Sequence, residues 1–266
     1  MLKNWIVFTD LDGTLLDHDN YSFEAALPAI NALKALNIPI FLNSSKTISE
    51  LTDISQQLDL NTSIIAENGS IIFDPQTQET TNLGVDYAKI CALLDTLREE
   101  YSLEFAGFHD WDTDALQNLT GLDARSATKA KQRQASEPLL WQDSEDKFTL
   151  FSDTLKANHL KIIRGGRFWH VMGEADKVIA MQTLHTRYQK TTTTPITSIA
   201  LGDSPNDNDM LCAADIGILV KNPNSKGFHP TPKNDQLTPH IISTKEIGPA
   251  GWNEAILGLL ETSTLK

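Results

Sequence analysis

Near its N-terminus the chain reads Trp5-Ile6-Val7-Phe8-Thr9-Asp10-Leu11-Asp12-Gly13-Thr14. The short apolar run Trp5–Thr9 is typical of a buried strand in a parallel sheet. Residues two apart project to the same side of an extended chain, so Asp10 and Asp12 converge just beyond that strand. Open α/β sheets place their ligand crevice at the carboxyl ends of their strands. We therefore expect this turn to belong to a functional site.

Strands and helices alternate along the residues that follow this turn. Apolar residues recur every three to four positions from Phe23 to Leu33, which predicts a helix. Ile38–Leu42 predicts a second strand, Thr47 and Glu50 form a capping box that opens a further helix, and Ser63–Ala66 predicts a third strand. This alternation predicts an α/β fold with a doubly wound, Rossmann-like parallel sheet and helices on both faces.

The middle of the chain follows a different pattern. The dipeptide Gly165-Gly166 lies between two strand-like runs and is typical of a hairpin, and hairpins with intervening helices indicate a separate α+β unit. Strand–helix alternation then resumes with a predicted helix over 176–188. We therefore predict a core domain of residues 1–83 and 174–266, interrupted by an inserted α+β cap of residues 84–173.

The charge balance limits the classes of partner. The chain has 35 Asp and Glu residues against 22 Lys and Arg, a formal net charge of -13. Such a surface repels nucleic-acid phosphates and anionic lipids, so we expect neither nucleic acid nor a membrane as a partner. The net negative charge is still compatible with a small anionic substrate, provided that basic residues converge at its binding site. Cys91 and Cys212 match no metal spacing, and we interpret them as reduced thiols of a cytoplasmic protein.

A second acidic cluster, Gly202-Asp203-Ser204-Pro205-Asn206-Asp207, directly follows the predicted strand Ile196–Leu201. Asp203 and Asp207 stand four residues apart across a turn that contains proline, so both can face one ion. Carboxylates this close repel one another unless they share a cation or a proton, and Mg²⁺ is the natural hard, oxygen-seeking cation. Either turn alone is compatible with a polar loop. Two at one edge of a sheet favour a metal site.

Two further polar residues accompany these turns. Ser44 follows the second strand, where a hydroxyl and helix-start N–H groups are suited to a phosphoryl oxygen, although helix capping alone also explains it. Lys177 opens a predicted helix, where it opposes the macrodipole. A lone lysine there is usually solvated, but charge balance against four aspartates and a phosphate gives this one a reason to be present.

In this order the four elements resemble the haloacid dehalogenase superfamily of Mg²⁺ phosphotransferases, over the whole chain. Further stretches are similar to the mannosyl-3-phosphoglycerate phosphatases, in which an α+β cap lies between the second and third motifs. The resemblance implies a phosphoric monoester hydrolase that converts mannosyl-3-phosphoglycerate to mannosylglycerate and phosphate with Mg²⁺ as cofactor. The stretches that carry it are Ser44-Ser45-Lys46-Thr47, Glu67-Asn68-Gly69, Ser136-Glu137-Pro138, Gly165-Gly166-Arg167-Phe168 and the acidic cluster at 202–207.

The same resemblance implies a role for each core residue. Asp10 is the nucleophile that forms an aspartyl-phosphate, and Asp12 is the general acid and then the general base. Ser44 and Lys177 hold and neutralise the transferring phosphoryl oxygens. The implied metal ligands are the side chains of Asp10 and Asp203, the main-chain carbonyl of Asp12, and Asp207 directly or through water.

The organic part of the substrate is expected to be bound by the cap. Phosphoglycerate carries a carboxylate, and a guanidinium matches a carboxylate at two points. Arg167 is our first choice for that contact, assisted by the backbone N–H groups of Gly165 and Gly166. Glu137 can accept hydrogen bonds from sugar hydroxyls. Weaker candidates for substrate binding are Arg133, Arg164 and His170, for which a solvated or packed structural role is the alternative.

Three alternatives stay open at this point. The sugar can be glucose, which makes glucosyl-3-phosphoglycerate or another phosphosugar the substrate of a related phosphatase. A phosphosugar mutase uses the same core chemistry if the aspartyl-phosphate survives water. A non-catalytic phosphoacceptor or binding module uses Asp10 only as a switch, but the acid–base position of Asp12 is useful mainly for turnover.

Overall fold

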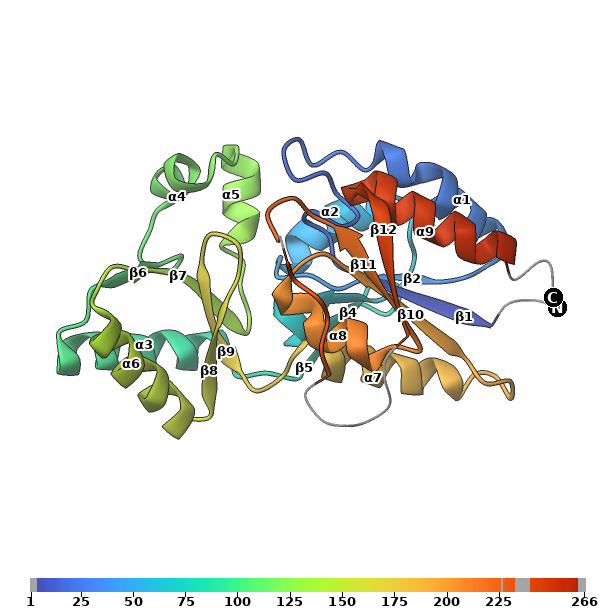
Figure 1. Ribbon diagram of the computed structural model, residues 1–266. Helices are drawn as coiled ribbons and strands as arrows, with labels where there is room; N and C mark the ends of the chain where they lie inside the picture. Colours follow the sequence, from blue (N-terminus) through green and yellow to red (C-terminus); the bar gives the residue numbers. More distant parts are fainter. Residues whose placement is uncertain (1–3, 226, 233–239, 263–266) are drawn as a thin grey trace. The chain divides into compact units, whose positions relative to one another are not determined.

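The computed structural model describes residues 4–225, 227–232 and 240–262, and they divide into two compact units (Figure 1). The first unit takes in the described parts of Met1–Ser44 and Lys177–Lys266, and the second is Ser45–Asp176. The domain limits predicted from the sequence, after residues 83 and 173, stay a prediction. The outermost positions of the predicted core domain, 1–3 and 263–266, lie outside the described residues.

The first unit is built on a five-stranded, entirely parallel sheet, which confirms the predicted α/β class. Strand β1 lies between β10 and β2, so the first predicted strand is interior and apolar on both faces. From edge to edge the strands are β12 (Ile241–Ile247), β11 (Ile216–Lys221), β10 (Thr197–Gly202), β1 (Trp5–Thr9) and β2 (Ile40–Leu42).

Helices cover both faces of this sheet, as the alternation predicted (Figure 1). On one face α1 (Leu27–Ala35), preceded by the 3₁₀ turn η1 (Glu24–Ala26), packs against α9 (Gly248–Thr262). On the other face α7 (Lys177–Gln189) packs against α8 (Asn208–Ala213). Trp252 of α9 is fully buried and donates from Nε1 to Thr9 Oγ1 over 3.0 Å, which joins the last helix to the first strand.

The third predicted strand does not join the parallel sheet. Strand β3 (Ile64–Ala66) pairs antiparallel with β4 (Ile71–Asp74), and β5 (Glu79–Asn82) continues this three-stranded sheet. The 3₁₀ turn η2 (Glu67–Gly69) is the reason, because its three successive residues have φ of 52°, 57° and 93° and reverse the chain at once. The dipeptide Asn68-Gly69, which is typical of a hairpin, lies in this turn. The expectation that the third strand joins the parallel sheet is therefore wrong.

The rest of the second unit is α+β, as predicted for the middle of the chain. An antiparallel sheet runs in the order β6-β7-β9-β8, and helices pack against β7 and β8. Its strands are β6 (Phe105–Gly107), β7 (Ser136–Trp141), β8 (Leu160–Arg164) and β9 (Trp169–Gly173). The helices of the second unit are α2 (Ile48–Gln57), α3 (Tyr87–Tyr101), α4 (Thr113–Thr120), α5 (Ala124–Ala130) and α6 (Glu145–Ala157). The capping box at Thr47 opens α2.

The core of this sheet is formed by apolar residues that α3 and α6 share with its strands, among them Leu94, Phe151 and Val171. A smaller cluster around Phe108 and Leu116 joins α4 to α5. In the described part of the chain, no helix combines the length and the apolar character that crossing a bilayer requires.

Candidate active site

Polar side chains follow four neighbouring strands of the parallel sheet at the point where each strand ends. Asp10 follows β1, Asn43 and Ser44 follow β2, Asp203 follows β10, and Asn222 follows β11. Because these strands are parallel neighbours, all of these residues lie at one edge of the sheet. The two acidic turns and Ser44 meet at that edge as the sequence predicts.

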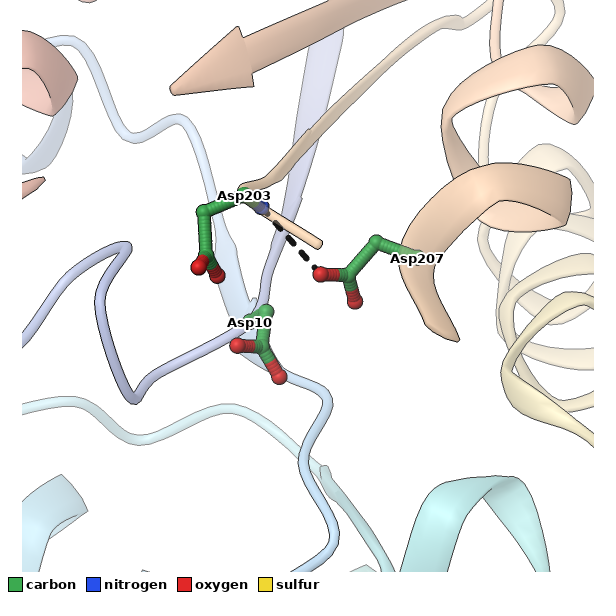
Figure 2. A group of neighbouring side chains, drawn as sticks. All are labelled: Asp10, Asp203 and Asp207. Carbon is green, nitrogen blue, oxygen red and sulfur yellow. Dashed lines mark hydrogen bonds between the residues drawn. The ribbon is translucent and has the colours of Figure 1, made fainter. Parts of the chain in front are cut away.

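Three carboxylates from the two acidic turns point toward one another at this edge (Figure 2). Asp10, Asp203 and Asp207 each offer one oxygen within 4.8 Å of the others, and all three side chains are buried. The backbone N–H of Asp203 donates to Asp207 Oδ2 over 3.2 Å, which fixes the two ends of the second turn to each other. Such a set of hard oxygen donors suits a divalent cation such as Mg²⁺.

Lys177, the first residue of α7, supplies a buried positive charge to this cluster. Its Nζ lies 2.5 Å from Asp10 Oδ1 and 2.7 Å from Asp207 Oδ1, and its side chain is 4% exposed. The side chain of Asn43 donates to the Lys177 carbonyl over 3.1 Å, so the start of α7 is tied to the end of β2. Burial alone would lower the pKa of Lys177, but attraction to Asp10 and Asp207 outweighs it and the pKa lies above its ordinary value.

One ammonium does not balance the three carboxylates. Burial, followed by repulsion from Asp207, raises the pKa of Asp10 well above its ordinary value although Lys177 opposes the shift. The same two causes raise the pKa of Asp203 to about 6. The protein thus holds more buried negative charge than it compensates, and a divalent cation fits both the charge and the donor atoms.

Asp203 is also held by two hydrogen bonds that sequence reasoning did not identify. Thr14 Oγ1 donates to Asp203 Oδ1 over 2.7 Å, and Asn222 Nδ2 donates to Asp203 Oδ2 over 2.5 Å. Asn222 directly follows β11. The rule that located Asp10 and Asp203, a polar residue at the carboxyl end of a parallel strand, would have found it.

Asp12 and Ser44 lie on segments that adjoin the cluster. Asp12 is half-buried in the turn after β1, where its backbone forms a bridge with Leu16. Ser44 is buried, and the preceding Asn43 N–H donates to the Thr9 carbonyl over 2.8 Å. Both residues are therefore held at the edge where Asp10 lies.

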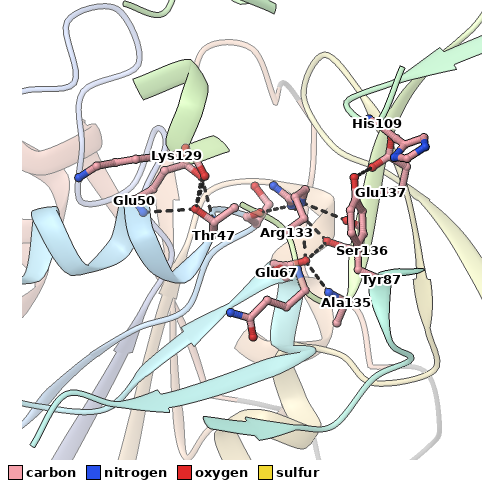
Figure 3. Close-up of polar contacts among 12 residues, drawn as sticks. Thr47, Glu50, Glu67, Tyr87, His109, Lys129, Arg133, Ala135, Ser136 and Glu137 are labelled. Atoms are coloured by element: carbon pink, nitrogen blue, oxygen red, sulfur yellow. Dashed lines mark hydrogen bonds and ion pairs between the residues drawn. The ribbon is translucent and has the colours of Figure 1, made fainter. Parts of the chain in front are cut away.

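Two cap candidates are buried in polar networks of the second unit (Figure 3). Arg133 Nε lies 3.6 Å from Glu67 Oε2, and the same guanidinium donates to the Ser45 carbonyl over 2.8 Å. Glu137 accepts from the Tyr87 hydroxyl over 2.7 Å and from the backbone N–H of His109 over 2.8 Å. Both side chains thus have internal partners.

The remaining cap candidates lie on or beside the turn between β8 and β9. Arg167 is exposed and donates to the Leu119 carbonyl, and Arg164 lies over the Trp169 ring at 5.0 Å from its centroid. His170 is buried on β9. Gly166 is exposed, and the Gly165 N–H donates to the Phe168 carbonyl over 2.9 Å, closing the turn. Arg167 and Arg164 present the exposed cationic groups of this turn.

Comparisons with known proteins agree with this architecture. Residues 7–227 match the family of haloacid dehalogenase-like hydrolases. A Methanococcoides burtonii protein, a glucosyl-3-phosphoglycerate/mannosyl-3-phosphoglycerate phosphatase, is 38% identical to this chain. The alignment of 269 positions covers 96% of this chain and 97% of that protein.

Solved structures show the same fold at low sequence identity. A haloacid dehalogenase-like hydrolase from Bacteroides thetaiotaomicron has a TM-score of 0.67 and 18% identity, with 97% of this chain and 100% of that one covered. A Thermoplasma acidophilum protein has a TM-score of 0.64 and 18% identity, with 98% and 99% covered. Both structural similarities cover nearly the full length of this chain.

Proposed function

Because this chain belongs to the haloacid dehalogenase-like hydrolases and is a phosphatase, we propose that it hydrolyses mannosyl-3-phosphoglycerate to mannosylglycerate and phosphate with Mg²⁺ as cofactor. The observation that carries the proposal is the buried cluster of Asp10, Asp203 and Asp207 around Lys177. The substrate class rests on the relative named for both the mannosyl and the glucosyl compound.

The proposed reaction has two in-line displacements at phosphorus. A carboxylate oxygen of Asp10 attacks and forms an aspartyl-phosphate, while the bond from phosphorus to the glycerate oxygen breaks and Asp12 gives that oxygen a proton. Asp12 then takes a proton from water, whose oxygen attacks the same phosphorus and releases phosphate, restoring Asp10. Ser44 and Lys177 hold the phosphoryl oxygens through both steps.

The side chains of Asp10, Asp203 and Asp207 and the main-chain carbonyl of Asp12 would hold the cation. When bound, Mg²⁺ supplies the positive charge that lets an anionic nucleophile approach an anionic substrate. Lys177 contributes a second positive charge from the protein itself, because its contact with Asp10 keeps it protonated.

For the organic part of the substrate we propose Arg167 as the partner of the glycerate carboxylate. Its guanidinium is exposed, and Gly165 and Gly166 of the same turn have backbone N–H groups that can assist. Glu137, Arg133, Arg164 and His170 stay weaker proposals, because Glu137, Arg133 and His170 are buried and Arg164 lies over Trp169.

The proposal is tested with a panel of phosphosugars that includes both glycosyl-3-phosphoglycerates, with Asp10→Asn as the control for contaminating phosphatases. We expect Mg²⁺-dependent release of phosphate from the mannosyl or the glucosyl compound. Rearranged substrate without free phosphate would indicate a mutase, and stable labelling of Asp10 without turnover would indicate a phosphoacceptor. Hydrolysis of other phosphosugars but of neither glycosyl-3-phosphoglycerate would contradict the substrate class.

The role of Arg167 has its own test. Arg167→Ala should lower kcat/KM for a glycosyl-3-phosphoglycerate roughly 10- to 150-fold, the equivalent of one charged hydrogen-bond partner. The kcat/KM for an aryl phosphate, which lacks the carboxylate, should fall far less. Arg167→Lys should recover only part of the loss because an ammonium lacks the planar fork. Equal losses on both substrates would assign Arg167 to the fold or to the phosphoryl site.

A further inference from the structure

Asp203 is restrained at both of its carboxylate oxygens. Thr14 holds one of its oxygens and Asn222 holds the other, and the two donors come from different segments, the turn after β1 and the residue after β11. Asp203 is 2% exposed, so bulk water does not compete for these bonds. Its carboxylate is therefore fixed in rotation about the Cβ–Cγ bond.

Asn222 is itself oriented by the loop that follows it. Its Oδ1 accepts from the backbone N–H of Asn224 over 2.8 Å, and its carbonyl accepts from the Ser225 N–H over 3.2 Å. Because Oδ1 is engaged by a backbone donor, the Nδ2 group faces Asp203. The loop after β11 thus presents an N–H donor to the metal-binding edge in a set direction.

In the turn after β1, the absence of a side chain at Gly13 leaves the space that the Asn222–Asp203 contact needs. Gly13 has a φ of +81°, and a Cβ on it would lie 2.8 Å from Asp203 Oδ2 and 3.4 Å from Asn222 Nδ2. Only glycine combines that backbone conformation with that space. The Asn222–Asp203 contact is thus built into the site by three segments together.

A carboxylate restrained in this way discriminates between cations. Each of its oxygens already accepts one hydrogen bond, and it cannot turn to offer both oxygens equally to one ion. Ca²⁺ commonly takes bidentate carboxylates at 2.3–2.6 Å in flexible shells, whereas Mg²⁺ needs near-ideal octahedral geometry at 2.0–2.1 Å. Restraint of Asp203 thus favours the smaller ion.

We propose that Asn222 is a positioning residue that restrains the Asp203 carboxylate and thereby sets the preference of the site for Mg²⁺ over Ca²⁺. The inference rests on the proposed use of Mg²⁺ and deepens it. It assigns a specificity-determining task to a residue that does not itself bind the cation or the substrate.

The test measures cation affinity directly, without turnover. Dissociation constants for Mg²⁺ and for Ca²⁺ are determined by calorimetry on chelator-treated parent protein and on Asn222→Leu, which keeps the size of the side chain and removes its donor. We expect the ratio of the Mg²⁺ to the Ca²⁺ constant to rise by about tenfold, the effect of losing one hydrogen bond to a charged group. Thr14→Val should shift the ratio in the same direction.

The matched control is Asn4→Leu, because Asn4 precedes β1 at the opposite end of the strand and its amide donates to the carbonyls of Thr194 and Pro195. It should leave the ratio unchanged. If Asn222→Leu does not fold, Asn222→Ser carries the test with a side chain too short to reach Asp203.

The outcomes separate this inference from the proposed function. An unchanged ratio in a folded Asn222 variant, or equal weakening of both cations, would overturn the inference and leave the phosphatase proposal intact. A shifted ratio in a protein that hydrolyses no glycosyl-3-phosphoglycerate would support the inference and reject the substrate. Parent protein that binds neither cation would overturn both the inference and the proposed cofactor.

Discussion

At the scale of single residues, opposing electrostatic effects act on the carboxyl of Asp10. Burial and Asp207 raise its pKa, while Lys177 at 2.5 Å opposes them. Its backbone is held as well, because Thr9 Oγ1 donates to the Asp10 carbonyl over 2.7 Å and itself accepts from Trp252. Position and charge are thus set by separate contacts, which suits a nucleophile that must attack along one line.

The first prediction concerns the two aspartates of this turn. Asp10→Asn should retain the fold and lose turnover, because an amide does not attack phosphorus at a useful rate. Asp12→Asn should slow both proton transfers by a factor on the order of 10² to 10⁴. Steady-state rates with a glycosyl-3-phosphoglycerate measure the effect, and thermal unfolding checks the fold. Rates within twofold of the parent would exclude the assigned roles.

The second prediction concerns Gly13. Gly13→Ala should destabilise the protein by about 1–2 kcal/mol through its left-handed backbone, and should weaken Mg²⁺ binding because the new Cβ meets Asp203. Urea unfolding and calorimetry measure the two effects. Gly166→Ala is the matched control, since a Cβ there has no neighbour within 4 Å. Equal effects of the two substitutions would contradict the argument.

At the scale of elements, the turn η2 is tied to the segment that leads into β7 (Figure 3). Glu67 is fully buried and accepts from the N–H groups of Gln134 and Ala135 over 2.8 and 3.1 Å and from the Ser136 hydroxyl over 2.7 Å. Strained backbone with φ > 0 persists only where the surroundings hold it, and these donors do so. The network therefore stabilises a turn that its own residues disfavour.

The third prediction tests the ion pair in this network. Arg133→Met leaves the Glu67 charge buried without a cation, which typically costs about 3–5 kcal/mol, with the lower end expected here because three donors remain. The double variant with Glu67→Gln should recover part of the loss in urea unfolding. Arg125→Met is the control, because Arg125 is 80% exposed in its contact with Asp53 and such pairs contribute about 0.2–1 kcal/mol. Losses of equal size would rule out a special role for the buried pair.

The fourth prediction concerns pH and Glu137 of β7. Burial raises the pKa of this carboxyl above its ordinary 4.5, although the His109 N–H and the Tyr87 hydroxyl oppose the shift. The native state therefore binds the proton more tightly than the unfolded state. The stability that this group contributes is full below pH 4.5 and is lost as the pH rises through the raised value.

The measurement compares Glu137→Gln with the parent by urea unfolding across this pH range. The free energy of unfolding of the parent should fall relative to that of the variant as the pH rises. Glu104, the residue before β6, is exposed, and Glu104→Gln should show no such divergence. Parallel pH profiles for the parent and Glu137→Gln would contradict the assignment.

At the scale of the whole molecule, three of the 35 acidic residues are buried together at one edge of the parallel sheet. The net charge of -13 is spread over the chain, but Asp10, Asp203 and Asp207 are buried together with one lysine. A cation bound there neutralises charge that β1, β10 and η3 (Pro205–Asp207) bring together. Binding of a cation at this edge would therefore stabilise the folded chain.

The fifth prediction follows from that coupling. Mg²⁺ at 100 times its dissociation constant should stabilise the native protein by about 2.7 kcal/mol and raise Tm, whereas NaCl at the same ionic strength should not. Asp203→Asn should lose most of this increase.

The same cation should be needed for turnover. Chelator should abolish turnover, and Ca²⁺ should inhibit because its looser shell can engage both oxygens of Asp10. Full activity in chelator would remove the metal from the mechanism.

The local chemistry of the sequence determined the class of fold and the position of most of the acidic cluster. Apolar runs such as Trp5–Thr9 define buried strands, and the capping box at Thr47 and Glu50 depends on residues three apart, so a window of a few residues contains the information. Polar residues directly after such strands share one sheet edge. That rule predicts from the sequence alone that Asp10 and Asp203 lie close together.

The tertiary structure alone decided the contacts between segments far apart in the chain. Strand β7 pairs with β9 although it contains Pro138, a residue that strands disfavour. Glu67 meets Arg133 across 66 positions, and Asn222 meets Asp203 from another strand. The periodicity of the sequence indicates which face of an element is apolar. A buried polar group requires a hydrogen-bond partner, and the identity of that partner depends on how the whole chain packs.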